Sequence, residues 1–167
     1  MIVAMFGDLL DENTRYVANF SLAGIQARAA KEFALVTCMD SRIEPLAMLG
    51  LVPGDAKILR NAGGRVTADV LRSLILATNF LGVRRIAVMQ HTDCALMARS
   101  DEQIRAELTG LAGDPGAWDF LAMSDPDRAL ASDVEAVRAC GLLPAGVGVE
   151  GWRYAVETGA IDRVVPS

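Results

Sequence analysis

The sequence predicts an α/β fold: a mainly parallel central sheet flanked by helices, with a C-terminal hairpin extending the sheet. Short, nearly continuous apolar runs alternate with longer segments in which apolar residues recur at helical spacing. This alternation is typical of a parallel sheet covered by helices. The chain of 167 residues is long enough for one domain with a sizeable core. It contains no repeat, low-complexity tract or linker, so we expect a single domain over residues 1–167.

The first half of the chain predicts two helices and two strands. Residues 11–28 carry apolar side chains near helical spacing, which indicates an amphipathic helix. Residues 33–38 are apolar almost throughout, as in a strand that is buried on both faces. A weaker strand is expected at 56–60, after a Pro-Gly-Asp turn. Residues 69–81 carry one apolar stripe and are followed by glycine, which predicts a helix that ends there.

The second half continues the alternation. Residues 85–90 are again apolar and predict a third strand. Helical patterns follow at 101–111 and 126–140, and a fourth strand begins near residue 147. A Thr-Gly turn then leads into a short apolar run at 161–165, which predicts the closing hairpin strand. In a parallel sheet of this kind, sites form at the carboxyl ends of the strands, near a switch in strand order.

Composition narrows the class of function. Apolar residues make up 52% and charged residues 22%, which is ordinary for a folded domain and unlike a disordered chain. The net charge of −5 argues against a nucleic-acid partner. No apolar run approaches the roughly 20 residues that span a bilayer, and the first ten residues lack the basic start of a secretory signal. Three cysteines are too few for a disulfide scaffold, so we expect reduced or metal-bound thiols and a cytoplasmic protein.

Two short clusters carry the chemistry. Cys38, Asp40 and Arg42 follow the first predicted strand, and His91 and Cys94 follow the third. Two thiolates and one imidazole suit zinc, which accepts sulfur and nitrogen ligands in tetrahedral geometry. Three protein ligands with one exchangeable position are the pattern of a catalytic zinc site, whereas four fixed ligands are the pattern of a structural one. The sequence has one histidine, so any mechanism that needs two within a subunit is excluded.

Asp40 and Arg42 suggest a site with two arrangements. Asp40 is placed to supply a fourth, oxygen ligand to the metal. The Arg42 guanidinium is also placed to hold that carboxylate in a bidentate pair and keep it off the metal. The predicted alternatives are therefore Asp40 on zinc, or Asp40 on Arg42 with water on zinc.

Other chemically suggestive residues are better explained by packing or turns. Cys140 has no partner motif, and Trp118 and Trp152 are interpreted as packing residues. The segment 60–65, Arg-Asn-Ala-Gly-Gly-Arg, lacks the Gly-Lys-Ser/Thr ending of a nucleotide-binding loop. It predicts a turn with positive φ that brings the backbone close to the site.

The order of these motifs resembles that of β-class carbonic anhydrases, in particular the compact microbial branch of the family. The family pattern is Cys-x-Asp-x-Arg, then Arg-Asn-Ala-Gly, then His-x-x-Cys. This chain has Cys38-Met-Asp40-Ser-Arg42, then the 60–63 segment, then His91-Thr-Asp-Cys94. The resemblance runs from about residue 33 to Cys94 and extends toward the final hairpin.

The resemblance implies an activity and an assembly. Cys38, His91 and Cys94 would bind zinc, and Asp40 and Arg42 would be the catalytic pair. The family reaction is the reversible hydration of carbon dioxide to bicarbonate and a proton. Family members are typically homodimers or higher homo-oligomers, with an N-terminal helix on the neighbouring subunit. The resemblance thus divides the chain into a helical arm, 1–30, and an α/β core, 31–167.

One residue departs from the family pattern. Glycine usually follows the second cysteine, whereas this chain has Ala95. The same fold and ligand set also occur in a carbon disulfide hydrolase, which stays open as an alternative substrate class. A structural zinc site with Asp40 as a permanent fourth ligand is a second alternative. A thiol redox protein is a third, although the chain lacks the Cys-x-x-Cys spacing of such proteins.

Overall fold

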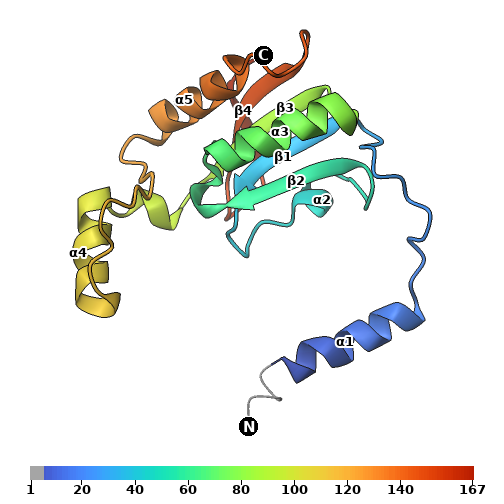
Figure 1. Cartoon of the computed structure of the whole chain (residues 1–167), viewed down its shortest axis with the longest axis horizontal. Helices are drawn as coiled ribbons and strands as arrows, with labels where there is room; N and C mark the ends of the chain where they lie inside the picture. Colours follow the sequence, from blue (N-terminus) through green and yellow to red (C-terminus); the bar gives the residue numbers. More distant parts are fainter. Residues whose placement is uncertain (1–5) are drawn as a thin grey trace.

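A five-stranded sheet forms the centre of the molecule (Figure 1). The computed structural model describes residues 6–167. The strands are β1 (Phe33–Cys38), β2 (Ala56–Asn61), β3 (Arg85–His91), β4 (Gly148–Tyr154) and β5 (Ile161–Val165). Their order is β2-β1-β3-β4-β5; the first four named are mutually parallel, and β5 pairs antiparallel with β4. The predicted mainly parallel sheet with a C-terminal hairpin is confirmed.

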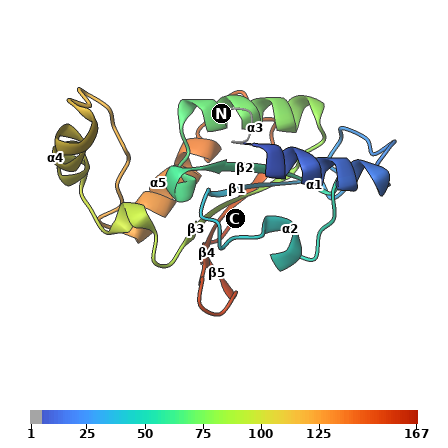
Figure 2. The same ribbon diagram turned by 90° about the horizontal axis from the view of Figure 1, so that it is seen from below.

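The two faces of the sheet are covered unequally. Helices α3 (Ala68–Phe80) and α5 (Pro126–Arg138) pack on one face, where their apolar residues join those of β1, β3 and β4 in one core. On the opposite face, the short helix α2 (Pro45–Met48) and loop residues such as Leu96 and Met123 pack against the strands (Figure 2). All six residues of β1 are buried, so the strand that ends at Cys38 is held from both sides.

The strand order reverses direction beside β1. The chain places β2 on one side of β1 and then crosses to place β3 on the other side. Crevices form at the carboxyl ends of the strands where such a reversal occurs. Cys38 is the last residue of β1 and His91 the last residue of β3, so the first and third strands deliver both side chains to this switch point.

Local sequence signals set the ends of the core helices. The Thr67 side chain accepts a hydrogen bond from the Val70 amide at the start of α3, and the Asp125 side chain accepts one from the Arg128 amide at the start of α5. Such caps satisfy amides that have no partner inside the helix. Helix α4 (Asp101–Ala112) begins with a capping box formed by Ser100 and Gln103. The helices predicted at 69–81, 101–111 and 126–140 are present within two residues of those bounds.

The N-terminal helix differs from the prediction. Helix α1 (Gly7–Ala18) starts earlier than residue 11 and ends ten residues before residue 28. Asn19 ends it, and Gly24 adopts a φ of +90°, which the helical spacing of apolar residues did not reveal. None of the residues of α1 is buried, and the helix extends away from the sheet (Figure 1). Residues 1–5 of the predicted arm lie outside the described residues.

Three short elements were not predicted. They are α2, which begins at a proline, and the 3₁₀ turns η1 (Ala62–Gly64) and η2 (Ala95–Met97). Each has four residues or fewer, too few for a helical period to be visible in the sequence. Both 3₁₀ turns border the switch point, and Leu96 and Met97 of η2 also pack against the core.

Candidate metal centre

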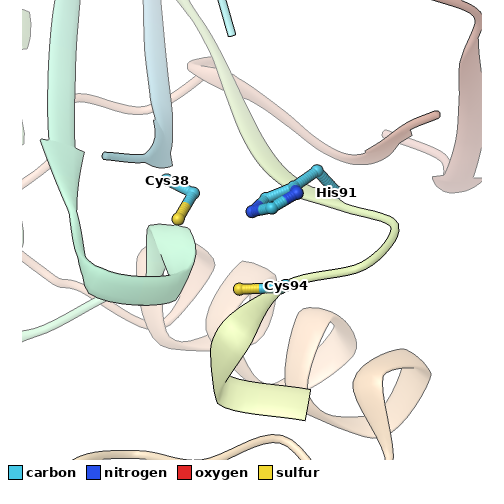
Figure 3. A group of neighbouring side chains, drawn as sticks. All are labelled: Cys38, His91 and Cys94. Atoms are coloured by element: carbon cyan, nitrogen blue, oxygen red, sulfur yellow. The ribbon is translucent and has the colours of Figure 1, made fainter. Parts of the chain in front are cut away.

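Three buried side chains converge at the switch point. Cys38 and His91 come from the ends of neighbouring strands, and Cys94 lies on the turn that follows β3. Their two sulfurs and one ring nitrogen lie within 4.8 Å of one another. Figure 3 shows the three side chains directed toward a common point between the strand ends. The structure thus brings together the three residues that the sequence predicted as metal ligands.

The imidazole of His91 is oriented for a ligand role. Its Nδ1 atom lies 2.8 Å from the carbonyl oxygen of Thr92. A carbonyl oxygen only accepts, so Nδ1 carries the proton and Nε2 keeps its lone pair. Within residues 6–167, Nε2 is buried and has no hydrogen-bond partner. A buried acceptor without a partner costs free energy, and a metal ion held with the two sulfurs satisfies it, so the residues present fit zinc.

The pKa values of the two thiols and the imidazole are shifted in different directions. A hydrogen bond from the Cys94 thiol lowers the pKa of Cys38 to about 4, against the opposing effect of burial. The same hydrogen bond, together with burial, raises the pKa of Cys94. Burial disfavours the imidazolium of His91, but the Cys38 thiolate, the Thr92 carbonyl and the Asp40 carboxylate together outweigh burial and raise the pKa of the ring. Metal binding requires deprotonated thiols and a neutral imidazole, so a cation at this point displaces protons.

Asp40 and Arg42 stand beside the three ligands. Arg42 donates through Nε and Nη2 to the two carboxylate oxygens of Asp40, at 3.0 and 2.8 Å. The Arg42 amide donates a third bond, at 2.9 Å. These donors hold the pKa of Asp40 well below its usual range. Asp40 also lies 3.8 Å from Nε2 of His91. Of the two predicted arrangements, the structure contains Asp40 on Arg42.

Comparison with known proteins places the chain in a family. The carbonic anhydrase family model matches residues 33–112. A solved carbonic anhydrase from Streptococcus mutans is 37% identical, with a TM-score of 0.90 over 98% of this chain and 99% of that one. The chain belongs to the β-carbonic anhydrase family. Another relative, the carbon disulfide hydrolase of an Acidianus strain, is 31% identical over 92% of this chain and 88% of its own length. Beta-carbonic anhydrase 1 of Mycobacterium tuberculosis is 29% identical over 95% and 97%.

Membership of the β-carbonic anhydrase family agrees with the donor set. Members of this family are zinc lyases, and the Cys-His-Cys group of this chain is positioned to bind a metal. The resemblance stated from the motifs is therefore confirmed.

In this β-carbonic anhydrase family member, two consecutive glycines form the turn η1 that follows β2, as the sequence predicted. Gly63 and Gly64 adopt φ values of +74° and +66°. A Cβ atom on Gly64 would lie 2.9 Å from the backbone nitrogen of Cys38 and the carbonyl oxygen of Met89. Backbone cannot yield at that distance, so only glycine fits between the two strand ends. The expectation of a turn with positive φ close to the site holds.

Arg60 is a site residue that sequence reasoning missed. Its guanidinium donates to the carbonyl oxygens of Cys38, Asp40 and Ile43, at 3.0, 2.6 and 3.2 Å. These bonds fasten the loop after β1 to the neighbouring strand β2. The signal was present, because Arg60 opens the Arg-Asn-Ala-Gly segment, but that segment was interpreted through its glycines.

A cavity of about 500 Å³ adjoins the ligands. Its lining includes Cys38, the charged pair Asp40 and Arg42, and the small or apolar residues Ala62 and Leu96. Ala95, the departure from the family pattern, also lines this cavity. A small substrate therefore has access to the strand ends through a cavity lined by both a charged pair and apolar side chains.

Proposed function

We propose that the protein catalyses the reversible hydration of carbon dioxide to bicarbonate and a proton, with zinc held by Cys38, His91 and Cys94. One observation carries the proposal: the Asp40 carboxylate is held by Arg42 and lies 3.8 Å from Nε2 of His91, beside the open cavity. Zinc held there supplies Lewis-acid chemistry by lowering the pKa of a water that it binds to about 7.

Asp40 and Arg42 act in the proposal as the catalytic pair. Asp40 remains ionised at neutral pH because Arg42 donates to both of its oxygens. An ionised carboxylate only accepts hydrogen bonds, so Asp40 orients the reacting water by accepting one of its protons in a hydrogen bond. Arg42 fixes the direction of that carboxylate. The alternative position of Asp40, as a fourth ligand, closes the site, so the contact with Arg42 favours the open form.

The walls of the cavity suit an uncharged, linear substrate. Ala62, Ala95 and Leu96 present carbon atoms to the space beside the ligands, and such a surface offers carbon dioxide no competing hydrogen bonds. Bicarbonate, the charged product, is better solvated in water than against this wall. The cavity therefore favours entry of the substrate and departure of the product.

Hydrolysis of carbon disulfide is a second candidate. A carbon disulfide hydrolase from Acidithiobacillus thiooxidans is 36% identical over 143 residues, 73% of this chain and 71% of that protein. Both substrates are linear and uncharged, so the apolar wall does not separate them. A family member active on carbon disulfide would convert one molecule with two waters into carbon dioxide and two molecules of hydrogen sulfide.

Two assays on the zinc-loaded protein test these candidates. Stopped-flow measurement of acidification by dissolved carbon dioxide should show turnover well above the buffer rate, and Asp40→Asn should lower it strongly. Release of hydrogen sulfide from carbon disulfide is measured in parallel. Hydrogen sulfide release with acidification at the buffer rate would replace the first candidate with the second. Inactivity in both assays with stoichiometric zinc would favour the structural zinc site.

We also propose that the protein functions as a homodimer or higher homo-oligomer through α1. This helix and the residue before it expose large apolar side chains that their own subunit leaves uncovered: Phe6, Leu9, Leu10, Tyr16 and Val17. An exposed apolar surface of this kind is typical of a protein interface. Within residues 6–167, no helix is long and apolar enough to cross a membrane.

A further inference from the structure

Arg42 is shared by two carboxylates that lie on different loops. Its Nη1 atom donates to Oδ2 of Asp93 at 2.7 Å, and Nη2 donates to the backbone carbonyl of Asp93 at 3.0 Å. Asp40 receives the remaining bonds, from Nε and Nη2. Asp40 belongs to the loop after β1, whereas Asp93 lies between His91 and Cys94. Arg42 therefore links the two loops that carry the three proposed ligands.

The number of donors shows how completely Arg42 is fixed. A guanidinium has five N–H donors in one plane. Four of them are engaged, two with Asp40 and two with Asp93. With Asp40 alone, the guanidinium keeps an unbonded Nη1 group, and the whole side chain remains free to leave toward solvent because 43% of it is exposed. Asp93 bonds that Nη1 group and thereby removes this freedom.

The backbone conformation of Asp93 indicates that its side chain has a role. Its φ is +54°, in the left-handed region that side chains other than those of asparagine and aspartate rarely adopt. Glycine fits this conformation without strain. An aspartate is less stable than a glycine in this backbone conformation. Its side chain offsets that cost by accepting the hydrogen bond from Arg42. Ordinary exposed ion pairs contribute little, but this one bridges two ligand loops.

We propose that Asp93 is a positioning residue that holds Arg42 in register with Asp40, an inference that rests on the proposed function of the site. Asp93 itself does not touch the reacting atoms. It keeps the Nε and Nη2 edge of Arg42 turned toward Asp40, so the carboxylate has a fixed partner away from the metal ligands. Without Asp93, Arg42 turns to solvent and Asp40 loses its orientation.

The test uses two substitutions that suit the left-handed backbone. Asp93→Gly removes the side chain and keeps the backbone carbonyl contact. Asp93→Asn keeps an oxygen that accepts from Nη1 but removes the charge. Asp69→Asn is the matched control, because Asp69 also receives a 2.7 Å hydrogen bond from an arginine and its side chain is 75% exposed, against 71% for Asp93. It lies on α3, so it changes the net charge equally without touching the site.

The first readout is activity per bound zinc. In the zinc-loaded protein we expect Asp93→Gly to retain one zinc per chain and to lower kcat/KM for carbon dioxide by about tenfold to a hundredfold, the usual effect of a misplaced catalytic group. Asp93→Asn should show a smaller loss, and Asp69→Asn none. Loss of zinc from Asp93→Gly would make Asp93 a structural part of the ligand loop and overturn the proposal.

The second readout does not depend on activity. In ¹⁵N-arginine-labelled, zinc-loaded protein, the Nη1 and Nη2 signals of Arg42, assigned with Arg42→Lys, should be separate because both groups are held. In Asp93→Gly, where Nη1 loses its partner, rotation about the Nε–Cζ bond becomes faster and the two signals should broaden and merge. Separate signals in Asp93→Gly would overturn the proposal even if activity fell. A parent protein inactive on carbon dioxide would refute the proposed function, whereas the signals would still decide whether Asp93 positions Arg42.

Discussion

Cys94 is held differently from the other two proposed ligands. Cys38 and His91 end central strands, whereas Cys94 stands on a turn and relies on η2 for its position. We expect Cys94→Ser to lose most zinc and to unfold at a lower temperature, because metal binding energy contributes to folding. Metal analysis and thermal unfolding measure both effects. Cys140→Ser is the matched control, since Cys140 is free and distant from the cluster. Full zinc occupancy in Cys94→Ser would contradict the ligand assignment.

The charged pair beside the ligands gives a second prediction at this scale. Asp40→Asn should retain zinc and lose most turnover, because three ligands remain while the orienting carboxylate is neutralised. Arg42→Ala should also lose turnover, because Asp40 is freed to move the few ångströms toward the ligands. Cobalt-substituted protein reports this move as a change in its visible spectrum. Arg72→Ala, which removes an exposed partner of Asp69, controls for the loss of charge. Parental activity in Arg42→Ala would refute the pairing.

Individual residues show what the sequence could and could not predict about the site. Cys38 and His91 were recognisable because each ends an apolar run, and parallel strands bring their ends together. Arg60 and Asp93 were not recognised, because each acts through a long side chain or a turn that reaches another loop. The sequence spacing carries no information about such contacts, since Arg42 and Asp93 are 51 positions apart.

The Asp101 carboxylate joins helix α4 to the segment that follows it. Asp101 accepts hydrogen bonds from the amides of Phe120 and Ala122, each at 2.7 Å. Burial works against its charge, but these amides outweigh burial and lower its pKa. Asp101 thus stabilises the fold above the pKa of an unfolded aspartate, about 3.9, and this contribution is lost as the pH falls through the lower folded value.

Replacing Asp101 should remove this pH dependence. The difference in free energy of unfolding between parent and Asp101→Asn should be about 1–3 kcal/mol at pH 6 and should shrink below pH 4. Urea unfolding of both proteins across that range measures the difference. Asp69→Asn is the control, because Asp69 is an acidic residue in the first turn of another helix, α3, and its carboxylate bonds the Arg72 side chain rather than backbone amides of a following segment. A difference that stays constant with pH would contradict this account.

Several elements that bury an apolar face were predictable from their periodicity. The stripe of α3 and the apolar run of β1 reflect burial, so their periodicity was visible in the sequence. Helix α1 has no buried residue, and its end at Asn19 depends on local backbone geometry that apolar spacing does not report. Helix α2 is shorter than a helical period can reveal. The division into an arm, 1–30, and a core, 31–167, stays a prediction.

At the scale of the whole molecule, the arm predicts how copies associate. We expect the parent protein to sediment as a dimer or larger species at micromolar concentration. Leu10→Glu combined with Val17→Glu should shift it toward monomer, because both side chains are about two thirds exposed and a buried carboxylate is costly. Asn13→Glu, a polar position on the same helix, is the control. An unchanged oligomer in the double variant would show that α1 is not the contact.

Because two of its ligands come from the ends of β1 and β3, the bound metal also cross-links the fold. Cys38 and His91 are 53 positions apart, so an ion held by both closes a long loop in the chain, and loop closure restricts the unfolded ensemble much as a disulfide does. This cross-link joins two inner strands of the sheet rather than its edge strands. Removing zinc with a chelator should therefore accelerate amide hydrogen exchange in β1 and β3 more than in the β4–β5 hairpin. Equal acceleration in all strands would mean that the ion stabilises the sheet without acting as a cross-link.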